Sequence, residues 1–157
     1  ELVEKARDAG VSSALETCGT GSREFYDRAA DLDCLFLYDI KGVDPEKHHA
    51  NTGVGVDRIH ANLDRLLARR ARVIARIPLI PGYNDSESDL ALLRAFLSER
   101  ASRLERAEIM PYHNLGVEKR RNLGREADDS IPAGRDFAPA WKAALDGCGV
   151  PVRVSGL

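Results

Sequence analysis

The chain has few cysteines, few aromatic residues and no long apolar run. Its 157 residues include three cysteines, one tryptophan and one methionine, and aromatic residues make up 6% of the total. Cys18, Cys34 and Cys148 are far apart and match no disulfide framework or common metal-ligand spacing. No stretch approaches the roughly 20 apolar residues that cross a bilayer, and no charged leader precedes the first helical pattern. We therefore expect reduced, structural thiols in a cytoplasmic protein that has no membrane partner.

The chain also lacks a strong excess of charge of either sign. A formal net charge of -2 gives no basic field for nucleic acid, and the arginine-rich runs at 69–72 and 119–121 are typical of solvated surfaces. Hydrophobic residues make up 43% and charged residues 31%, which is typical of a globular protein. A core of this size buries roughly two thirds of the surface that the unfolded chain exposes. We expect residues 1–157 to form a single domain.

The first residues, ELVEKARDAG, already follow a helical pattern, with no methionine and no capping residue before them. We therefore expect a truncated chain that begins inside a longer protein.

Short apolar segments alternate with amphipathic ones along the sequence. Segments rich in β-branched residues and about as long as a strand occur at 12–17, 34–40, 73–80, 107–111 and 150–154. Between them, apolar residues recur three and four positions apart, most clearly at Ile59, Leu63, Leu66, Leu67, Leu90, Leu93, Phe96 and Leu97. Strands that alternate with helices of this length predict an α/β fold with a parallel sheet and right-handed crossovers.

Capping residues set the expected helix ends. Ser22, Asp85 or Ser86, and Asp136 are predicted to begin helices, and glycines at 10 and 147 lie where helices should stop. The segment 114–139 is the longest irregular stretch, rich in glycine, proline and charge. It is predicted to be a functional or partner-facing loop.

Polar residues gather where the predicted strands end. Ligands bind at the carboxyl ends of parallel strands, because the loops there vary while the sheet holds them in place. The sequence therefore predicts one site at this edge of the sheet. The residues that leave the strands there are Glu16, Thr17, Asp39, Lys41, Arg76, Tyr112 and His113.

Each of these residues also has a structural interpretation. Without a ligand, Asp39 and Lys41 would form an ion pair on one face of their strand. Arg76 taken alone is compatible with a surface arginine, and His113 with a hydrogen-bonded structural histidine. The histidines at 48–49 have no cysteine or carboxylate at metal-ligand spacing and are predicted to be structural.

Taken together, these segments resemble the radical S-adenosylmethionine enzymes that activate glycyl radical enzymes, the family of the pyruvate formate-lyase activating enzyme. The resemblance covers nearly the whole chain and rests on the motifs LETCGTG, YDIK, HHANTG, RIPLIPGYND and MPYHNLGVEKRRNLG, in this order. It implies that the chain is the C-terminal portion of a partial (β/α) barrel.

The resemblance also implies a reaction and its cofactors. Such enzymes use a reduced 4Fe-4S cluster to cleave S-adenosylmethionine, and the 5′-deoxyadenosyl radical abstracts hydrogen from a partner's glycine. By matching position, Asp39 and Lys41 would hold the ribose and carboxylate end of S-adenosylmethionine, and Arg76 and His113 would contact its nucleoside side. Thr17 would belong to the same cofactor site. The implied partners are a glycyl radical enzyme and an electron donor such as flavodoxin or ferredoxin.

A monovalent cation near the methionine carboxylate is implied as well. Glu16, Thr17, the carbonyl of Leu37 and Asp39 would surround it. Glu16 stands where the family usually has aspartate and is one methylene longer, and Val56 stands where many relatives have a polar residue.

The cluster-binding motif of the family is absent from this sequence. The resemblance implies three cysteines spaced C-x3-C-x2-C and a following Gly-Gly-Glu, and neither occurs here. Thiolates are the ligands of such clusters, and Cys18, Cys34 and Cys148 do not have this spacing. The chain alone is expected to be inactive in radical chemistry.

Two alternative functions remain open at this point. The chain could be a remnant that binds S-adenosylmethionine without cleaving it, or that docks a glycyl radical enzyme. Apart from the resemblance, Lys41 beside Asp39 at a strand end would also suit the Schiff-base lysine of a barrel aldolase.

Overall fold

A five-stranded parallel sheet forms the centre of the protein, in a computed structural model that describes residues 1–126 and 130–155. The strands lie side by side in chain order, from β1 to β5. Each of the five segments that the sequence predicted to be strands overlaps one strand, and the α/β prediction is confirmed. The strands are β1 (Ala14–Thr17), β2 (Leu35–Asp39), β3 (Arg72–Leu79), β4 (Arg106–Pro111) and β5 (Val152–Val154).

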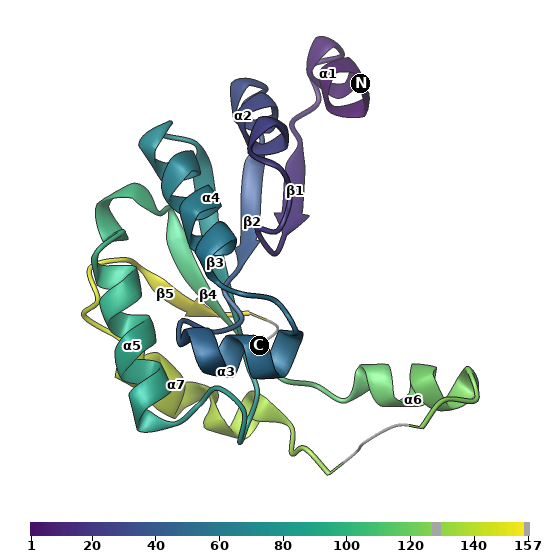
Figure 1. Ribbon diagram of the computed structural model, residues 1–157, viewed down its shortest axis with the longest axis vertical. Coiled ribbons are helices and arrows are strands. Elements are labelled where there is room, and N and C mark those ends of the chain that lie inside the picture. Colours follow the sequence, from purple (N-terminus) through teal and green to yellow (C-terminus); the bar gives the residue numbers. More distant parts are fainter. Residues whose placement is uncertain (127–129, 156–157) are drawn as a thin grey trace.

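Helices connect successive strands and line the sheet (Figure 1). Because the strands follow one another in chain order with right-handed crossovers, the connecting helices lie on one side of the sheet, as in part of a (β/α) barrel. Within the described residues, no helix is long and apolar enough to cross a membrane. The α-helices are α1 (Leu2–Asp8), α2 (Arg23–Asp31), α3 (Pro45–Thr52), α4 (Asp57–Ala68), α5 (Glu87–Ser98), α6 (Leu115–Asn122) and α7 (Ala138–Leu145), and two 3-10 turns are η1 (Ala101–Arg103) and η2 (Gly134–Phe137).

The two faces of the sheet differ in polarity. In β2, Phe36 and Tyr38 are buried, whereas the alternate residues, including Asp39, are only partly buried. The buried residues pack against Leu63 and Leu66 of α4 in one hydrophobic cluster. The apolar face of the sheet is therefore covered by helices, and we call the opposite face, which carries Asp39, the open face.

The strand register brings charged residues together on this open face. Asp39 of β2 is the ladder partner of Arg76, Arg76 is the partner of Glu108, and Glu108 is the partner of Arg153. Glu16 of β1 lies at the level of the β2 residue two positions before Asp39. A row of alternating charges thus crosses the open face, and it meets the carboxyl end of β2 at Asp39.

Two helices differ from the sequence prediction. Helix α3 was not among the segments that the sequence analysis assigned to helices; there the Asp44 carboxylate accepts a hydrogen bond from the backbone N of Lys47 at 2.8 Å, and Pro45 fits the first turn. Gly53, at φ 74°, ends this helix. Helix α6 lies inside the segment 114–139, so the prediction that this whole segment is irregular was wrong. In Figure 1, α6 projects away from the sheet.

The predicted cap at Asp136 was also wrong. The chain first forms η2, and Phe137 is the residue that precedes α7. Gly134 donates a backbone hydrogen bond to the Tyr112 carbonyl at 2.8 Å, and a Cβ at Gly134 would lie 2.7 Å from the Tyr112 nitrogen. This close approach fixes the segment before α7 to the end of β4. The caps at Ser22 and Ser86 are confirmed.

Candidate functional site

Arg76 connects three strands on the open face. Its Nη1 atom lies 2.8 Å from a carboxylate oxygen of Glu16 in β1, and its Nε lies 3.8 Å from Oδ1 of Asp39 in β2. The same Nε donates to the sulfur of Met110 in β4 at 3.0 Å. The Arg76 side chain is only 14% exposed, so its guanidinium is fixed within the site rather than free in solvent. The sequence suggested that Glu16, Asp39 and Arg76 converge, and the structure brings them together.

Asp39 has a buried oxygen that accepts no hydrogen bond from the described residues. The 3.8 Å separation from Arg76 is within the range of an ion pair but too long for a hydrogen bond. Burial raises the pKa of the Asp39 carboxyl, the charges of Arg76 and Lys41 act in the opposite direction, and Glu16 raises it further. An unsatisfied buried acceptor is costly, so this oxygen is suited to a ligand hydroxyl.

Lys41 follows β2 and exposes its side chain to solvent. Among the described residues, Arg76 is the cation within ion-pair distance of Asp39, so the structural alternative, an ion pair between Asp39 and Lys41, is not the contact that forms. An exposed ammonium also lacks the desolvated surroundings that activate a Schiff-base lysine. The ammonium of Lys41 is instead accessible to an anionic group of a ligand.

Thr17 faces the helices rather than the open face. Its hydroxyl lies 2.7 Å from the Tyr26 hydroxyl of α2 and accepts a hydrogen bond from the backbone N of Gly19 at 3.1 Å. Leu37 is the ladder partner of Glu16. Within the described residues, no group of three His, Cys, Asp or Glu side chains could hold a metal ion. The cation site around Glu16, Thr17, Leu37 and Asp39 stays a prediction.

The glycine turn after β1 is held by a residue that the sequence analysis missed. Asn62 of α4 is buried, and its amide donates to the carbonyls of Gly19 at 2.8 Å and Gly21 at 3.1 Å. Gly19 has φ 83°, and a Cβ there would lie 2.0 Å from the Tyr38 hydroxyl. The sequence feature that could have identified Asn62 is its position as a polar residue within the apolar stripe of α4.

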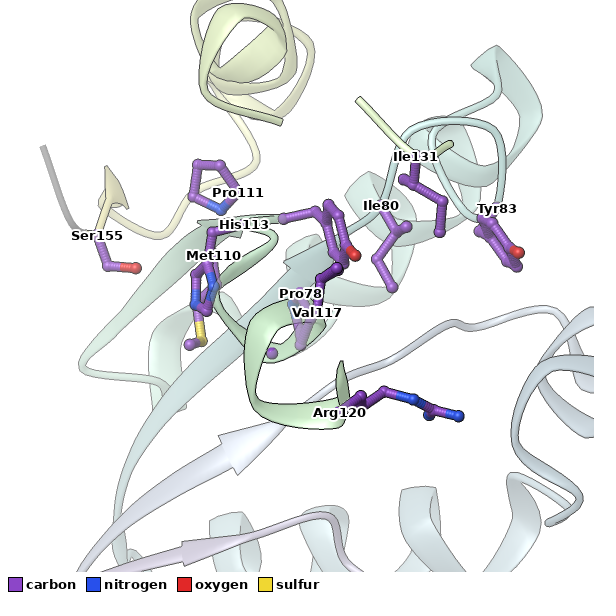
Figure 2. A pocket seen from close by; sticks show the side chains of 12 residues that line it. Pro78, Ile80, Tyr83, Met110, Pro111, His113, Val117, Arg120, Ile131 and Ser155 are labelled. Carbon is purple, nitrogen blue, oxygen red and sulfur yellow. The ribbon is translucent and has the colours of Figure 1, made fainter. Parts of the chain in front are cut away.

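A cavity of about 830 Å³ opens where β3 and β4 end. In Figure 2, Ile80, Tyr83 and Ile131 lie on one side of it, and Met110, Pro111 and Ser155 lie on the other. Met110 contacts Arg76 and lines the cavity, so the charged cluster and the cavity are adjacent. The lining residues are Pro78, Ile80, Tyr83, Met110, Pro111, Tyr112, His113, Gly116, Val117, Arg120, Ile131 and Ser155.

The histidines at 48–49 were expected to be structural, and this is confirmed for His48. His48 is buried, and its Nδ1 lies 2.8 Å from the Val54 carbonyl and 3.2 Å from the Thr52 hydroxyl. These contacts hold the turn between α3 and α4.

The three cysteines are free, and Cys34 and Cys148 are buried. Cys18 is partly exposed, and a hydrogen bond with Thr20 lowers the pKa of its thiol.

Comparisons of the sequence find activating enzymes among the relatives of this protein. No protein-family model matches it. It is 38% identical over 127 residues to the choline trimethylamine-lyase activating enzyme of Oleidesulfovibrio alaskensis, a match that covers 80% of this chain and 41% of the relative. The isethionate sulfite-lyase activating enzyme of Nitratidesulfovibrio vulgaris is 42% identical over 130 residues, with the same coverage of 80% and 41%. This chain is a homologue of the glycyl-radical-enzyme activating enzymes.

A third homologue shows that the family serves several partners. The trans-4-hydroxy-L-proline dehydratase activating enzyme of Clostridioides difficile is 34% identical over 118 residues, which are 75% of this chain and 39% of that enzyme. The chain spans less than half the length of these three relatives. These relatives are activating enzymes for two lyases and a dehydratase, and they do not single out the pyruvate formate-lyase type.

Solved structures confirm the fold. A domain of the pyruvate-formate lyase-activating enzyme from Bacteroides vulgatus superposes with a TM-score of 0.79 at 22% identity, covering 99% of this chain and 88% of that domain. A radical SAM methyltransferase from Sphaerobacter thermophilus gives a TM-score of 0.68 at 16% identity, over 93% of this chain and 41% of that enzyme. The expected partial barrel is thus the fold of radical S-adenosylmethionine enzymes.

The family implies S-adenosylmethionine and a 4Fe-4S cluster, and this chain fits only the first. The unsatisfied Asp39 oxygen suits a hydroxyl donor, exposed Lys41 suits a carboxylate, and the mostly apolar cavity suits a flat base. No cluster of cysteines gathers in the part of the chain that the structure describes. The cluster ligands therefore do not come from these residues.

Proposed function

We propose that this chain is the S-adenosylmethionine-binding portion of an activating enzyme for a glycyl radical enzyme. The observation that carries the proposal is the buried, unsatisfied oxygen of Asp39, which lies beside Arg76 at the carboxyl edge of the sheet and next to a nucleoside-sized cavity. The homology to activating enzymes supports the same conclusion.

Each site residue would then have a distinct binding role. The Asp39 carboxylate accepts a hydrogen bond from a ribose hydroxyl, and Lys41 pairs with the methionine carboxylate. Arg76 holds Glu16 and Asp39 in place and lies near the nucleoside. His113 and the apolar residues of the cavity surround the base and exclude water from it. When bound, S-adenosylmethionine supplies the radical that removes a hydrogen atom from the partner's glycine.

The proposal extends to the whole protein. Its protein substrate is a glycyl radical enzyme, of the pyruvate formate-lyase type or of the lyase and dehydratase types that the homologues serve, and a flavodoxin or ferredoxin supplies electrons. Residues 1–157 form one domain of this enzyme. The free cysteines support a reducing, cytoplasmic location.

Calorimetric titration of the complete protein with S-adenosylhomocysteine, which is not cleaved, tests the binding role of Asp39. Hydrogen bonds to charged groups contribute about 1.5–3 kcal/mol. At 1.4 kcal/mol per tenfold, Asp39→Ala should weaken binding by about tenfold to a hundredfold. Asp8→Ala, which alters an exposed carboxylate in α1, is the matched control and should leave affinity unchanged. Equal affinity of Asp39→Ala and the wild type would contradict the proposal.

An activation assay tests which glycyl radical enzyme is the partner of this protein. The complete enzyme, with its cluster reconstituted, is mixed with purified glycyl radical enzymes of the pyruvate, choline, isethionate and hydroxyproline types. Electron paramagnetic resonance then detects the glycyl radical. A signal with one of them identifies the partner type, and the absence of a signal with the pyruvate enzyme would exclude that type.

A further inference from the structure

Asn84 ties the ends of two neighbouring strands together. It lies in the turn between β3 and α5, where its Oδ1 accepts a hydrogen bond from the backbone N of Ile80 at 2.8 Å. Its Nδ2 donates to the carbonyl of Pro78 at 2.8 Å, and also to the carbonyl of Lys41 at 3.0 Å. The first two hydrogen bonds close the turn. The third crosses to the chain that leaves β2.

This third hydrogen bond extends the sheet beyond its backbone ladder. The last ladder pair between β2 and β3 is Asp39 with Arg76, and the backbone N of Ile40 still donates to the Arg76 carbonyl at 2.7 Å. One residue further on, a side-chain amide replaces the backbone donor for the Lys41 carbonyl. Asn84 therefore adds a side-chain connection between the two strand ends beyond their last backbone hydrogen bond.

The two strand ends carry different parts of the proposed site. Asp39 and Lys41 come from the end of β2, whereas Pro78 and Ile80 line the cavity at the end of β3. Asn84 forms hydrogen bonds with residues at both strand ends. It does not line the cavity itself.

We propose that Asn84 is a positioning residue that fixes the distance between the end of β2, which binds the ribose and the amino-acid end, and the cavity at the end of β3, which binds the base. This inference rests on the proposed function and adds a residue to it. A ligand that occupies both parts gains affinity only when their spacing matches its length, because the second contact is then made without further loss of freedom. A ligand that occupies only the base cavity does not depend on this spacing.

Two ligands separate these effects in the complete protein. S-Adenosylhomocysteine occupies both parts, and adenine, which lacks the ribose and the amino acid, occupies only the cavity. Asn84→Ser is too short to reach the Lys41 carbonyl and adds no charge, and Asn84→Ala serves as a second variant. The matched control is Asn51→Ser, at an exposed asparagine in α3. Circular dichroism establishes that each variant is folded.

The expected result is a selective loss. In both Asn84 variants the affinity for S-adenosylhomocysteine should fall about tenfold or more, while the affinity for adenine stays within about twofold of wild type. Asn51→Ser should bind both ligands as the wild type does. An equal loss for both ligands, no loss for either, or unfolding of both variants would overturn the positioning role. Failure of the wild type to bind either ligand would instead refute the proposed function.

Discussion

Among single residues, Asp39 best shows how a binding group lowers the stability of the free protein. Burial raises the pKa of its carboxyl above the ordinary value of 3.8, and the charges of Arg76 and Lys41 oppose this shift without cancelling it. The folded chain therefore holds the Asp39 proton more tightly than the unfolded chain does. The contribution of this group to the free energy of unfolding consequently falls as the pH rises from about 3.8 through the raised pKa.

Replacing Asp39 with its neutral isostere should separate stability from binding. Asp39→Asn removes the buried charge, so at pH 7 the melting temperature should be equal to or higher than that of the wild type. The difference should shrink as the pH falls below the raised pKa of Asp39, where the wild-type carboxyl is protonated. Calorimetric melting across this pH range, with titration of S-adenosylhomocysteine at pH 7, checks both effects. A variant that melts below the wild type at pH 7 would contradict the account of Asp39.

Asn62 should matter for stability. Asn62→Ala removes both donors to the glycine turn and leaves two carbonyls unsatisfied, at an expected cost of about 1–3 kcal/mol in the free energy of unfolding. Urea unfolding measures this cost. Asn122→Ala, at an exposed position in α6, is the control and should change stability by less than about 0.5 kcal/mol. A similarly small effect for Asn62→Ala would contradict the stabilising role of Asn62.

Among the secondary-structure elements, those with strong apolar patterns could be predicted from the sequence. The strands and α4 bury continuous or periodic apolar residues, and this pattern does not depend on distant contacts. Helix α3 has one buried residue, His48, and depends on its caps instead. Helix α6 likewise buries only Val117. Such helices give little periodic signal, which explains why the sequence analysis missed them.

The same reasoning applies to the candidate site. Asp39 and Arg76 could be predicted because they interrupt apolar strands at one end of the sheet. The contact of Arg76 with Met110 depends on the register between β3 and β4, which the sequence does not specify. The bond of Asn84 to Lys41 joins residues 43 positions apart through a side chain, and periodicity carries no information about it.

The contribution of the N-terminal cap of α5 to stability can be tested by mutation. Ser86 and Asp89 form a capping box, and Asp89 also forms an ion pair with Lys47 of α3, with 2.6 Å between the nitrogen and the oxygen. Ser86→Ala should lower the free energy of unfolding by about 1 kcal/mol, because the first turn of α5 loses its cap. Ser98→Ala, at the exposed end of the same helix, is the control in chemical denaturation. Equal stability of the two variants would show that the cap contributes nothing.

At the scale of the whole molecule, the arrangement of layers explains where a ligand can bind. The helices cover the apolar face of the sheet, so charged side chains are placed on the open face. There the register aligns Asp39 and Arg76, and the ion pair of Arg76 with Glu16 adds β1 to the cluster. The cavity at the ends of β3 and β4 adjoins these charges through Met110. The fold therefore joins a polar and an apolar binding region along one edge.

The central claim is that this edge binds a single molecule of S-adenosylmethionine. A crystal structure of the complete protein with S-adenosylmethionine tests it most directly. We predict electron density for the ribose against Asp39, for the methionine carboxylate near Lys41, and for the base in the cavity beside His113. Density for the nucleoside at the opposite ends of the strands, or on the helix-covered face, would contradict the account.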